Sequence, residues 1–331
     1  MDVLIIGGTQ FVGRHLAEAA LEAGHKVTLF NRGKTGPGLY PQAETLVGDR
    51  DGDLDALKGR KWDVVFDPSG YLPRVVQQSA ELLKDAVGRY VFISSISVYV
   101  DSDEADENAP LNTMDDDPTS EDIPKYYGAL KVACENVVSE IYGDRALNAR
   151  PGFIIGPYDP VPRLPGLLWR YDRDGERVAG RPEQGVQVIH ARDMADWLLK
   201  AVDQKLSGAY NLTGRPVKMN DLLDTVVSLT GKNTTVSYVG DELLKVRDIP
   251  PVDGVGYWVP AEAEGIMRAN VDKVFAAGYT ERPLRQSISE TLEWLRREGF
   301  QSDNLKERIE GRVLSMEKET EILEAFKQQD N

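Results

Sequence analysis

The first two-thirds of the chain alternates short apolar runs, rich in β-branched and aromatic residues, with amphipathic stretches of helical period. Such alternation is typical of a parallel sheet covered by helices on both faces. The predicted strands are 3–7, 26–31, 44–47, 63–67, 89–94, 146–150 and 186–190. The predicted helices between them are 14–24, 74–87, 126–142 and 191–203. We therefore expect an α/β fold with a doubly wound parallel sheet.

The segment VLIIGGTQFVGRHL joins the first predicted strand to the first helix. Glycines there allow a tight turn and let the backbone and the helix N-terminus approach a pyrophosphate. Gln10 stands where such loops most want a third glycine, but a residue there needs only an allowed φ and a side chain that points away or binds the ligand. The order of strand, loop and helix predicts a Rossmann-type dinucleotide site. Its predicted loop residues are Gly7, Thr9, Gln10, Phe11, Val12 and Gly13.

The end of the second strand indicates which dinucleotide fits. A carboxylate there would bind the adenosine ribose and repel a 2′-phosphate, but this chain has Asn31 and Arg32. NADP is therefore favoured over NAD. In the alternative, Arg32 points into solvent and Asn31 binds the unphosphorylated ribose of NAD. Asp49, in the segment VGDRD, is placed either to meet the adenine or to cap a turn.

Catalytic chemistry is indicated by FISSISVY at 92–99 and YYGALKVACE at 126–135. Tyr127 and Lys131 are four residues apart on a helix and so share one face. A lysine beside a phenol lowers the pKa of the phenol, which lets tyrosine exchange a proton with a carbinol or carbonyl near neutral pH. Ser95, at the carboxyl end of a strand, is placed to hold the substrate oxygen.

Together these segments resemble a known family. The matching pieces are GGTQFVG, GDRD, WDVVFDPSG, SSISVY, YGALK, RPGFIIGP, VIHARDMA and GAYNLTG. Over about residues 1–300 the chain resembles an extended short-chain dehydrogenase/reductase of the NAD-dependent epimerase/dehydratase superfamily. The non-glycine Gln10 and the segment FNRG are similar to the subgroup that contains chloroplast stem-loop RNA-binding proteins and uncharacterised bacterial reductases.

The resemblance implies a role for each matching residue. Tyr127 is implied as the general acid/base, Lys131 as the group that lowers its pKa and holds the nicotinamide ribose, and Ser95 as the group that polarises the substrate oxygen. Pro68 and Ser69 are expected along the diphosphate and ribose of the cofactor, and Pro151 beside the nicotinamide. Family members commonly dimerise through two helices of each subunit, so a homodimer is expected.

One departure from the family concerns the substrate. Nucleotide-sugar epimerases of the superfamily usually carry an asparagine three residues after the arginine that opens RPGFIIGP, and it binds the diphosphate of the substrate. This chain has Phe153 there. A UDP-sugar substrate is therefore disfavoured.

The pattern loosens after about Gly156 into loops with proline and glycine, and the predicted helices 219–230 and 284–298 do not alternate with strands. We expect a dinucleotide-binding domain at 1–156 to which 186–213 return, a smaller substrate-binding lobe at 157–185 and 214–300, and a polar helical extension at 301–331. In that extension Ser315 is a candidate N-cap. Four residues where the lobe begins are expected to be structural or solvent-facing, with anion or sugar binding as the alternative: Arg163, Trp169, Arg170 and Arg181.

An acidic segment lies directly before the predicted catalytic helix. Residues 101–124 hold ten acidic side chains and no basic one. Such a segment is too polar for the core, and two interpretations stay open. It is either a solvated loop or a flap over the active site that disfavours anionic substrates.

Composition excludes several other classes. A net charge of -15 repels phosphate backbones, so nucleic acid is not an expected partner. One cysteine cannot form an intrachain disulfide, and three histidines in no zinc spacing predict no metal site. No apolar run reaches the roughly 20 residues of a membrane helix. The apolar strand pattern that begins at Val3 leaves no room for a secretory signal, so a cytoplasmic protein is expected.

The sequence thus predicts an enzyme with a small-molecule substrate. The leading interpretation is an NAD(P)-dependent oxidoreductase that transfers hydride at a carbinol or carbonyl carbon, with Tyr127 as acid/base. The first alternative is a sugar or sugar-nucleotide epimerase or dehydratase that retains its NAD. The second alternative is a non-catalytic, RNA-binding relative.

Overall fold

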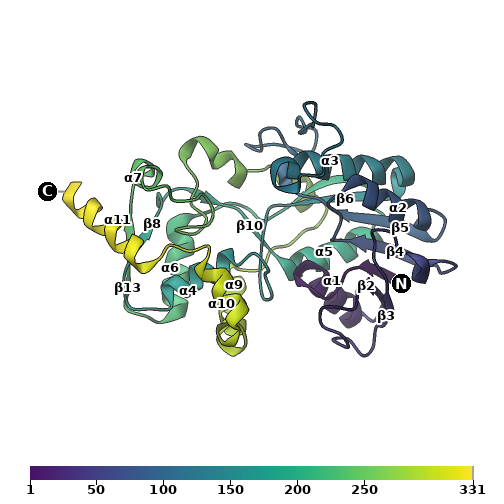
Figure 1. Ribbon diagram of the computed structural model, residues 1–331, viewed down its shortest axis with the longest axis horizontal. Coiled ribbons are helices and arrows are strands. Elements are labelled where there is room, and N and C mark those ends of the chain that lie inside the picture. Colours follow the sequence, from purple (N-terminus) through teal and green to yellow (C-terminus); the bar gives the residue numbers. More distant parts are fainter. Residues whose placement is uncertain (330–331) are drawn as a thin grey trace. The chain divides into compact units, whose positions relative to one another are not determined.

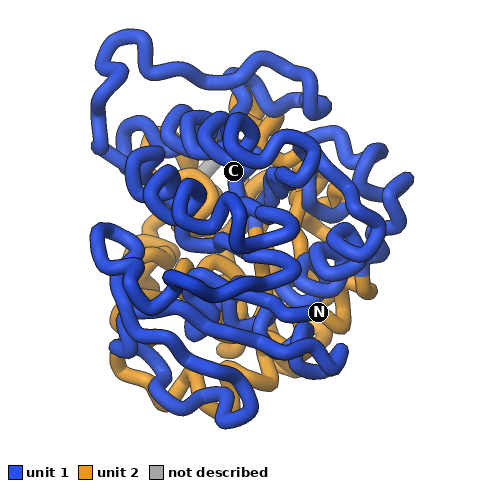
Figure 2. The backbone as a smooth tube through the Cα atoms, turned by 90° about the vertical axis from the view of Figure 1, so that its right-hand side faces the viewer, with its two compact units in different colours: residues 1–153, 191–214, 269–281 blue, residues 154–190, 215–268, 282–331 orange. Residues whose placement is uncertain are grey.

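The computed structural model describes residues 1–329, and the chain divides into two compact units (Figure 2). Unit 1 contains Met1–Phe153, Ala191–Gly214 and Ala269–Glu281. Unit 2 contains Ile154–His190, Arg215–Arg268 and the chain from Arg282 onward. Where the sequence suggested a boundary at 156 and a return at 186, the first unit ends at Phe153 and resumes at Ala191.

Unit 1 is built on a seven-stranded sheet, and all of its strand pairs are parallel. The strand order is β11-β6-β5-β4-β1-β2-β3. The strands are β1 (Asp2–Ile6), β2 (Lys26–Asn31), β3 (Glu44–Val47), β4 (Trp62–Asp67), β5 (Val87–Ile93), β6 (Ala146–Pro151) and β11 (Gly208–Leu212). The predicted doubly wound α/β fold is confirmed. The predicted strand 186–190 is not in this sheet, and β11 forms its edge instead.

Helices cover both faces of this sheet (Figure 1). One pair consists of α1 (Phe11–Glu22) and α5 (Ala191–Asp203), and the other of α2 (Pro73–Leu83) and α3 (Ile123–Tyr142). A short helix, α8 (Asp272–Ala276), follows the last return of the chain to unit 1. Because β1 and β4 lie in the middle of the sheet and are covered on both sides, their residues Val3–Ile6 and Val64–Phe66 are buried almost completely.

The strand order reverses between β1 and β4, since the chain winds from β1 toward β3 and then from β4 toward β11. In open α/β sheets a ligand crevice forms outside the carboxyl ends of the strands at such a reversal. The loops that leave β1, β2, β4, β5 and β6 therefore meet at one edge. These are the loops in which the sequence placed its candidate site residues.

Unit 2 contains short strands, which form two-stranded sheets, and a group of packed helices. Its predicted single strand at 186–190 is two strands, because the chain changes partner at Gln187: β9 (Gly185–Val186) pairs with β12 (Val217–Lys218), whereas β10 (Val188–His190) pairs with β7 (Phe153–Ile155). The third pair is β8 (Gly175–Ala179) with β13 (Thr234–Tyr238). The helices are α4 (Arg163–Tyr171), α6 (Met219–Thr230), α7 (Asp241–Val246), α9 (Leu284–Arg297), α10 (Asp303–Glu310) and α11 (Met316–Gln329).

The C-terminal extension is part of unit 2. As predicted, Ser315 caps α11, because its Oγ accepts the N–H of Lys318 at 3.2 Å. Ile322 of α11 is fully buried in an apolar cluster with Val178 and Trp258, and Phe326 packs against this cluster. The apolar face of α11 therefore packs against the core of its own unit.

One buried acid in unit 2 gives the fold a pH dependence. Asp159 is 4 % exposed, and its Oδ1 accepts the N–H of Val161 at 2.8 Å. Burial raises the pKa of Asp159 to about 7, against the opposing effects of that hydrogen bond and the charge of Arg163. The folded state therefore binds a proton between about pH 4 and pH 7 that the unfolded state releases, so this group lowers stability as pH rises through that range.

We expect Asp159→Asn to remove this dependence, because asparagine imitates the neutral acid and keeps an acceptor for Val161. The variant should match the parent protein near pH 4 and exceed its free energy of unfolding by on the order of 3 kcal/mol at pH 8. Urea unfolding at both pH values measures this. Asp172→Asn, in a partly exposed pair with Arg296, is the control. An equal difference at both pH values would contradict the assignment.

Candidate active site

The loop after β1 explains why glutamine is acceptable at position 10. Gly7 and Gly8 have φ of 119° and 93°, which side chains rarely adopt. A Cβ on Gly13 would lie 2.7 Å from the amide nitrogen of Gly8, so a side chain there would force the helix away from the loop. Gln10 has an ordinary extended conformation, with φ of -129° and ψ of 143°. The loop therefore requires glycine at three positions and not at Gln10.

The start of α1 fits an anionic group. Gln10 is its N-cap and makes no side-chain capping bond, although the Gln10 carbonyl accepts the N–H of Arg14 at 3.1 Å. The first N–H groups of a helix have no intrahelical acceptor and carry the positive end of the dipole. Phe11 turns inward against His15, and the two rings form an edge contact at 6.1 Å. Thr9 and Val12 are half-buried beside the loop. The arrangement suits the diphosphate of a dinucleotide.

Asn31 braces this loop from the end of β2. Its Nδ2 donates to the carbonyl of Gly7 at 3.4 Å, and its Oδ1 accepts the N–H of Gly33 at 2.8 Å. Arg32, the next residue, is exposed. Asp49 adopts the turn role, because its Oδ1 accepts the N–H of Asp51 at 3.1 Å. At this edge of the sheet, the Asn31 side chain is therefore hydrogen-bonded to the backbone, whereas the Arg32 side chain is exposed to solvent.

A buried ion pair that the sequence did not indicate joins the loops after β3 and β4. Arg50 binds the fully buried carboxylate of Asp67 with two hydrogen bonds of 2.6 and 2.9 Å. Tyr90 donates to the same carboxylate at 2.8 Å. Burial opposes the charged form of Asp67, but Arg50 and Tyr90 outweigh it and lower the pKa of this carboxyl. Ser69 also belongs to this network, since its Oγ donates to the carbonyl of Ile6 at 3.0 Å and accepts from Arg50.

The candidate catalytic helix touches the turn after β5. A Cβ on Gly128 would lie 2.0 Å from the carbonyl oxygen of Ser97, so α3 approaches this turn more closely than any side chain would allow. In the same turn Ser95 Oγ accepts the N–H of Ser97 at 3.1 Å. Tyr127 directly precedes Gly128. The contact therefore places the part of α3 that carries Tyr127 against the turn that carries Ser95.

Lys131 is 3 % exposed, and its ammonium lies at the carboxyl edge of the sheet. Its Nζ donates to the carbonyls of Gly70 at 2.8 Å and Ile93 at 2.7 Å. An ammonium has three donors, so one remains for a ligand. Burial lowers the pKa of Lys131 to about 8. The group is still mostly charged at neutral pH, and its charge is little screened by solvent.

Tyr71 is a further residue at this edge. Its ring lies 4.8 Å from Lys131 Nζ and 6.4 Å from the centre of the Tyr127 ring. The ring is 45 % exposed, which is unusual for a large aromatic side chain next to a buried cation. No motif indicated this residue, because Tyr71 follows DPSG in a segment without helical or strand periodicity.

The acidic segment 101–124 is anchored to unit 1. Asn112 donates to the carbonyls of Ser97 and Tyr99 at 3.0 and 2.7 Å. Asp116 accepts from the hydroxyl of Tyr126 at 2.6 Å. Arg74 of α2 pairs with Glu121 at 2.6 Å. The segment is thus neither free in solvent nor detached from the helix that carries Tyr127.

Pro151 ends β6, where it is buried and aligned with Leu212 of β11. A Cβ on the next residue, Gly152, would lie 2.7 Å from Thr213 Oγ1, so β6 and β11 stay close beyond their last ladder pair. Pro68 lies against the glycine loop, with its Cγ 3.5 Å from the Cβ position of Gly13. Both prolines are therefore at the carboxyl edge.

The four candidate residues of the smaller lobe have partners within unit 2. Arg163 and Arg181 pair with carboxylates of Asp253 at 3.6 Å and Asp241 at 3.0 Å. Trp169 forms an edge contact with Phe300 at 5.2 Å. Arg170 binds the buried carboxylate of Glu319. Their expected structural role is consistent with these contacts.

The chain belongs to the NAD dependent epimerase/dehydratase family. The family profile matches residues 3–68 and 73–213, which include the glycine loop, the Ser95 turn, and α3 with Tyr127 and Lys131. The resemblance drawn from the motifs is confirmed. The expectation of a nucleotide-dependent enzyme is confirmed with it.

A curated relative is the chloroplast stem-loop binding protein of 41 kDa b from Arabidopsis thaliana. The two sequences are 28% identical over 244 residues, which cover 64% of this chain. The match spans 58% of the length of that relative. It agrees with the subgroup that Gln10 and FNRG indicated.

Solved structures of the family share the fold. UDP-glucuronic acid 4-epimerase from Bacillus cereus, in complex with NAD, has a TM-score of 0.66 and 17% identity over 90% of this chain and 99% of that chain. dTDP-glucose 4,6-dehydratase from Bacillus anthracis, also in complex with NAD, has a TM-score of 0.66 and 16% identity over 92% of this chain and 99% of that chain.

Membrane-spanning helices and metal-binding clusters were searched for in the described part of the chain. No helix among residues 1–329 is long and apolar enough to cross a membrane. Within the same residues no group of three histidine, cysteine or acidic side chains lies close enough together to hold a metal ion.

We expect Gly128→Ala to move α3 away from the Ser95 turn, because its Cβ would overlap the carbonyl oxygen of Ser97. The variant should lose about 1–3 kcal/mol of unfolding free energy and most of its turnover. Thermal unfolding and an activity assay measure the two effects. Gly240→Ala is the matched control, because Gly240 has φ of -71° and open space around its Cβ position. Full activity in Gly128→Ala would contradict the role of this contact.

Proposed function

We propose that this protein is an NAD(P)-dependent epimerase or dehydratase that oxidises and rearranges a secondary alcohol of a sugar or sugar nucleotide. The observation that carries the proposal is the buried ammonium of Lys131, bound to the carbonyls of Gly70 and Ile93 one helical turn from Tyr127. A surface Tyr-x-x-x-Lys pair has no such environment. Here the lysine charge is fixed at the edge where the family binds its cofactor.

The chain's own residues would manage the proton. Lys131 stabilises the phenolate of Tyr127, so Tyr127 can accept the proton of a substrate hydroxyl and later return it to a carbonyl oxygen. The remaining donor of Lys131 is suited to a hydroxyl of the nicotinamide ribose. The hydroxyl of Ser95, which donates to Ser97 Oγ at 3.1 Å, can turn toward the substrate oxygen. A bound dinucleotide supplies a reversible hydride acceptor for the carbinol carbon.

The family assignment favours the epimerase or dehydratase interpretation over the simple reductase that the sequence put first. In an epimerase or dehydratase, the hydride removed from the substrate returns to it in the same turnover. The cofactor then needs no exchange with solvent. Such an enzyme shows no net change in nicotinamide absorbance.

The substrate class is narrowed by two features of unit 1. Phe153 has no side-chain donor for a diphosphate at the position where nucleotide-sugar epimerases have asparagine. The anchored acidic segment 101–124 adds ten carboxylates next to the helix of Tyr127. The first feature favours a sugar without a nucleoside diphosphate, and the second favours a reacting end without negative charge. A homodimer and a cytoplasmic location remain predictions, and the RNA-binding alternative would require a steep salt-dependent RNA affinity.

Mutation of the acid/base tests the proposal directly. We expect Tyr127→Phe to lower kcat by about 10²–10⁴-fold and to leave dinucleotide affinity within a factor of about two. Denatured protein should release its dinucleotide, which chromatography identifies, and turnover of the substrate should proceed without net absorbance change at the nicotinamide band. Tyr158→Phe, in unit 2, is the control. Retained turnover in Tyr127→Phe, or stoichiometric oxidation of added cofactor, would overturn the respective part of the proposal.

Arg32 tests the choice between NADP and NAD. If its guanidinium binds a 2′-phosphate, Arg32→Gln should weaken NADP binding roughly tenfold, equivalent to about 1.4 kcal/mol, and leave NAD binding unchanged. Isothermal titration of both nucleotides gives the ratio. Lys34→Gln, two residues on and also exposed, controls for general charge. Equal effects on both nucleotides would show that Arg32 does not read the phosphate.

A further inference from the structure

Unit 2 contains a cavity of about 270 Å³ that the proposed reaction does not use. It is lined by Trp169 and three arginines from the end of α4 and the start of β8, and by residues 313–316 and 319 of the C-terminal extension. The family profile ends at residue 213, so six of the ten lining residues lie outside the matched region. All of the lining residues belong to unit 2.

The buried charges of this cavity do not balance. Arg170 and Arg177 are 4 % and 7 % exposed, and they share one buried carboxylate, that of Glu319. Glu319 binds Arg170 Nη2 through one oxygen, and its other oxygen lies 3.9 Å from Arg177 Nε. The same carboxylate also accepts the N–H of Val178 at 3.0 Å. Arg177 also donates to the carbonyls of Arg170, Glu176 and Asp174, which are neutral acceptors. The two buried cations therefore share a single carboxylate.

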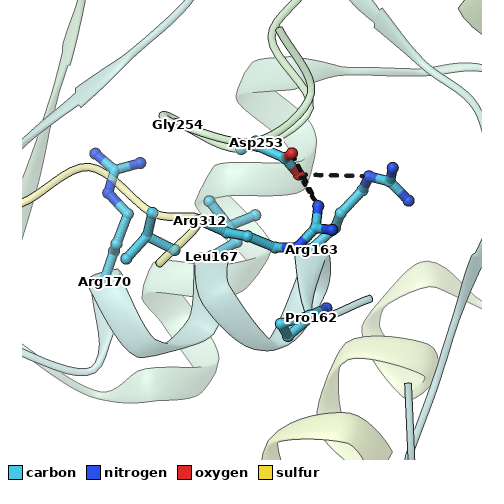
Figure 3. Close-up of a pocket in the computed structure, with 9 residues that line it drawn as sticks. Pro162, Arg163, Leu167, Arg170, Asp253, Gly254 and Arg312 are labelled. Carbon is cyan, nitrogen blue, oxygen red and sulfur yellow. Dashed lines mark hydrogen bonds and ion pairs between the residues drawn. The ribbon is translucent and has the colours of Figure 1, made fainter. Parts of the chain in front are cut away.

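Arg170 also has unused donors. Its Nε and Nη1 have no hydrogen-bond partner among the described residues, although both atoms are shielded from solvent. Figure 3 shows that its guanidinium lies away from Asp253, whose carboxylate is bound by Arg163 and Arg312 at 3.6 and 2.9 Å. Asp253 therefore does not neutralise Arg170. A buried guanidinium with unused N–H donors can bind an anion through charge-assisted hydrogen bonds.

The open side of the cavity adds further positive charge. The Arg173 guanidinium lies 4.7 Å above the Trp169 ring, and the sulfur of Met316, a weak acceptor, is 3.5 Å from its Nη1. The first turn of α11 also borders this space. Ser315 Oγ accepts the N–H of Lys318. The N–H groups of Met316 and Glu317 have no acceptor within the helix, because both residues lie in its first turn. The exposed Glu310 at the rim is the opposing charge.

We propose that this cavity binds a phosphate-bearing small molecule. A phosphate dianion between Arg173 and the first turn of α11 would balance the excess charge of Arg170 and Arg177. A monovalent carboxylate would match three arginines and a helix N-terminus less well. The volume exceeds that of free phosphate, and Trp169 offers an apolar surface to an organic part. A phosphate ester of sugar size is therefore the occupant.

The test uses glucose 1-phosphate and inorganic phosphate as probes, titrated into the full-length protein at constant ionic strength. We expect saturable binding of glucose 1-phosphate, weaker binding of inorganic phosphate, and at least a tenfold loss of affinity in Arg173→Gln. Arg173 is chosen because it is only half-buried, so the variant should fold. Arg297→Gln, which removes an exposed arginine of the same unit paired with Glu298, should change nothing.

Four outcomes would overturn the proposal. The first is the absence of saturable binding with either probe. The second is equal affinity in Arg173→Gln and the parent protein. The third is displacement of the probe by NAD, which would place binding at the glycine loop. The fourth is inorganic phosphate binding as tightly as the ester, which would contradict the assignment of a phosphate ester.

Discussion

The candidate active site depends on one buried cation. The ammonium of Lys131 is stable inside unit 1 only because two carbonyls accept from it, and these belong to segments that follow β4 and end β5. At the carboxyl ends of parallel strands, carbonyls beyond the last ladder pair have no N–H of a neighbouring strand as a partner. The sheet edge thus supplies the acceptors, and α3 supplies the donor. Any shift of α3 would leave all three groups without a partner.

A second buried network keeps that edge in place. The pair of Arg50 and Asp67 connects the loops after β3 and β4, and Tyr90 connects both to β5. Its members lie next to the glycine loop, since Ser69 binds Ile6 as well as Arg50. Removing one partner from such a pair costs far more than the pair contributes, because a charge is left buried. The loops that we propose as the dinucleotide site are therefore held in place by a buried ion pair.

Much of unit 1 was predictable from the sequence for a simple physical reason. Strands buried on both faces are continuous apolar runs, so 26–31 was located at its observed bounds. The edge strand 44–47 was also located at its observed bounds, although only Leu46 in it is buried. The prediction that glutamine is acceptable at position 10 was also correct, because this position requires only an allowed φ and Gln10 has an extended backbone. β11 was missed as a strand because GAYNL mixes glycine and asparagine with apolar residues. Its Asn211 is hydrogen-bonded to Glu107 and Ala105, which are far away in the chain. The hydrogen bonds of Arg50 with Asp67 could not be predicted, because the sequence alone does not show which loops lie side by side.

Unit 2 was far less predictable, because its elements are short and find partners over long sequence separations. The segment 186–190 has the pattern of one strand, but its partners are two different strands. The contact of Arg170 with Glu319 spans 149 residues. Because Glu319 and Ile322 complete the core of this unit, its folding on the ribosome cannot finish until α11 has been synthesised. During translation, the buried arginines of residues 154–190 therefore lack their carboxylate partner until α11 emerges.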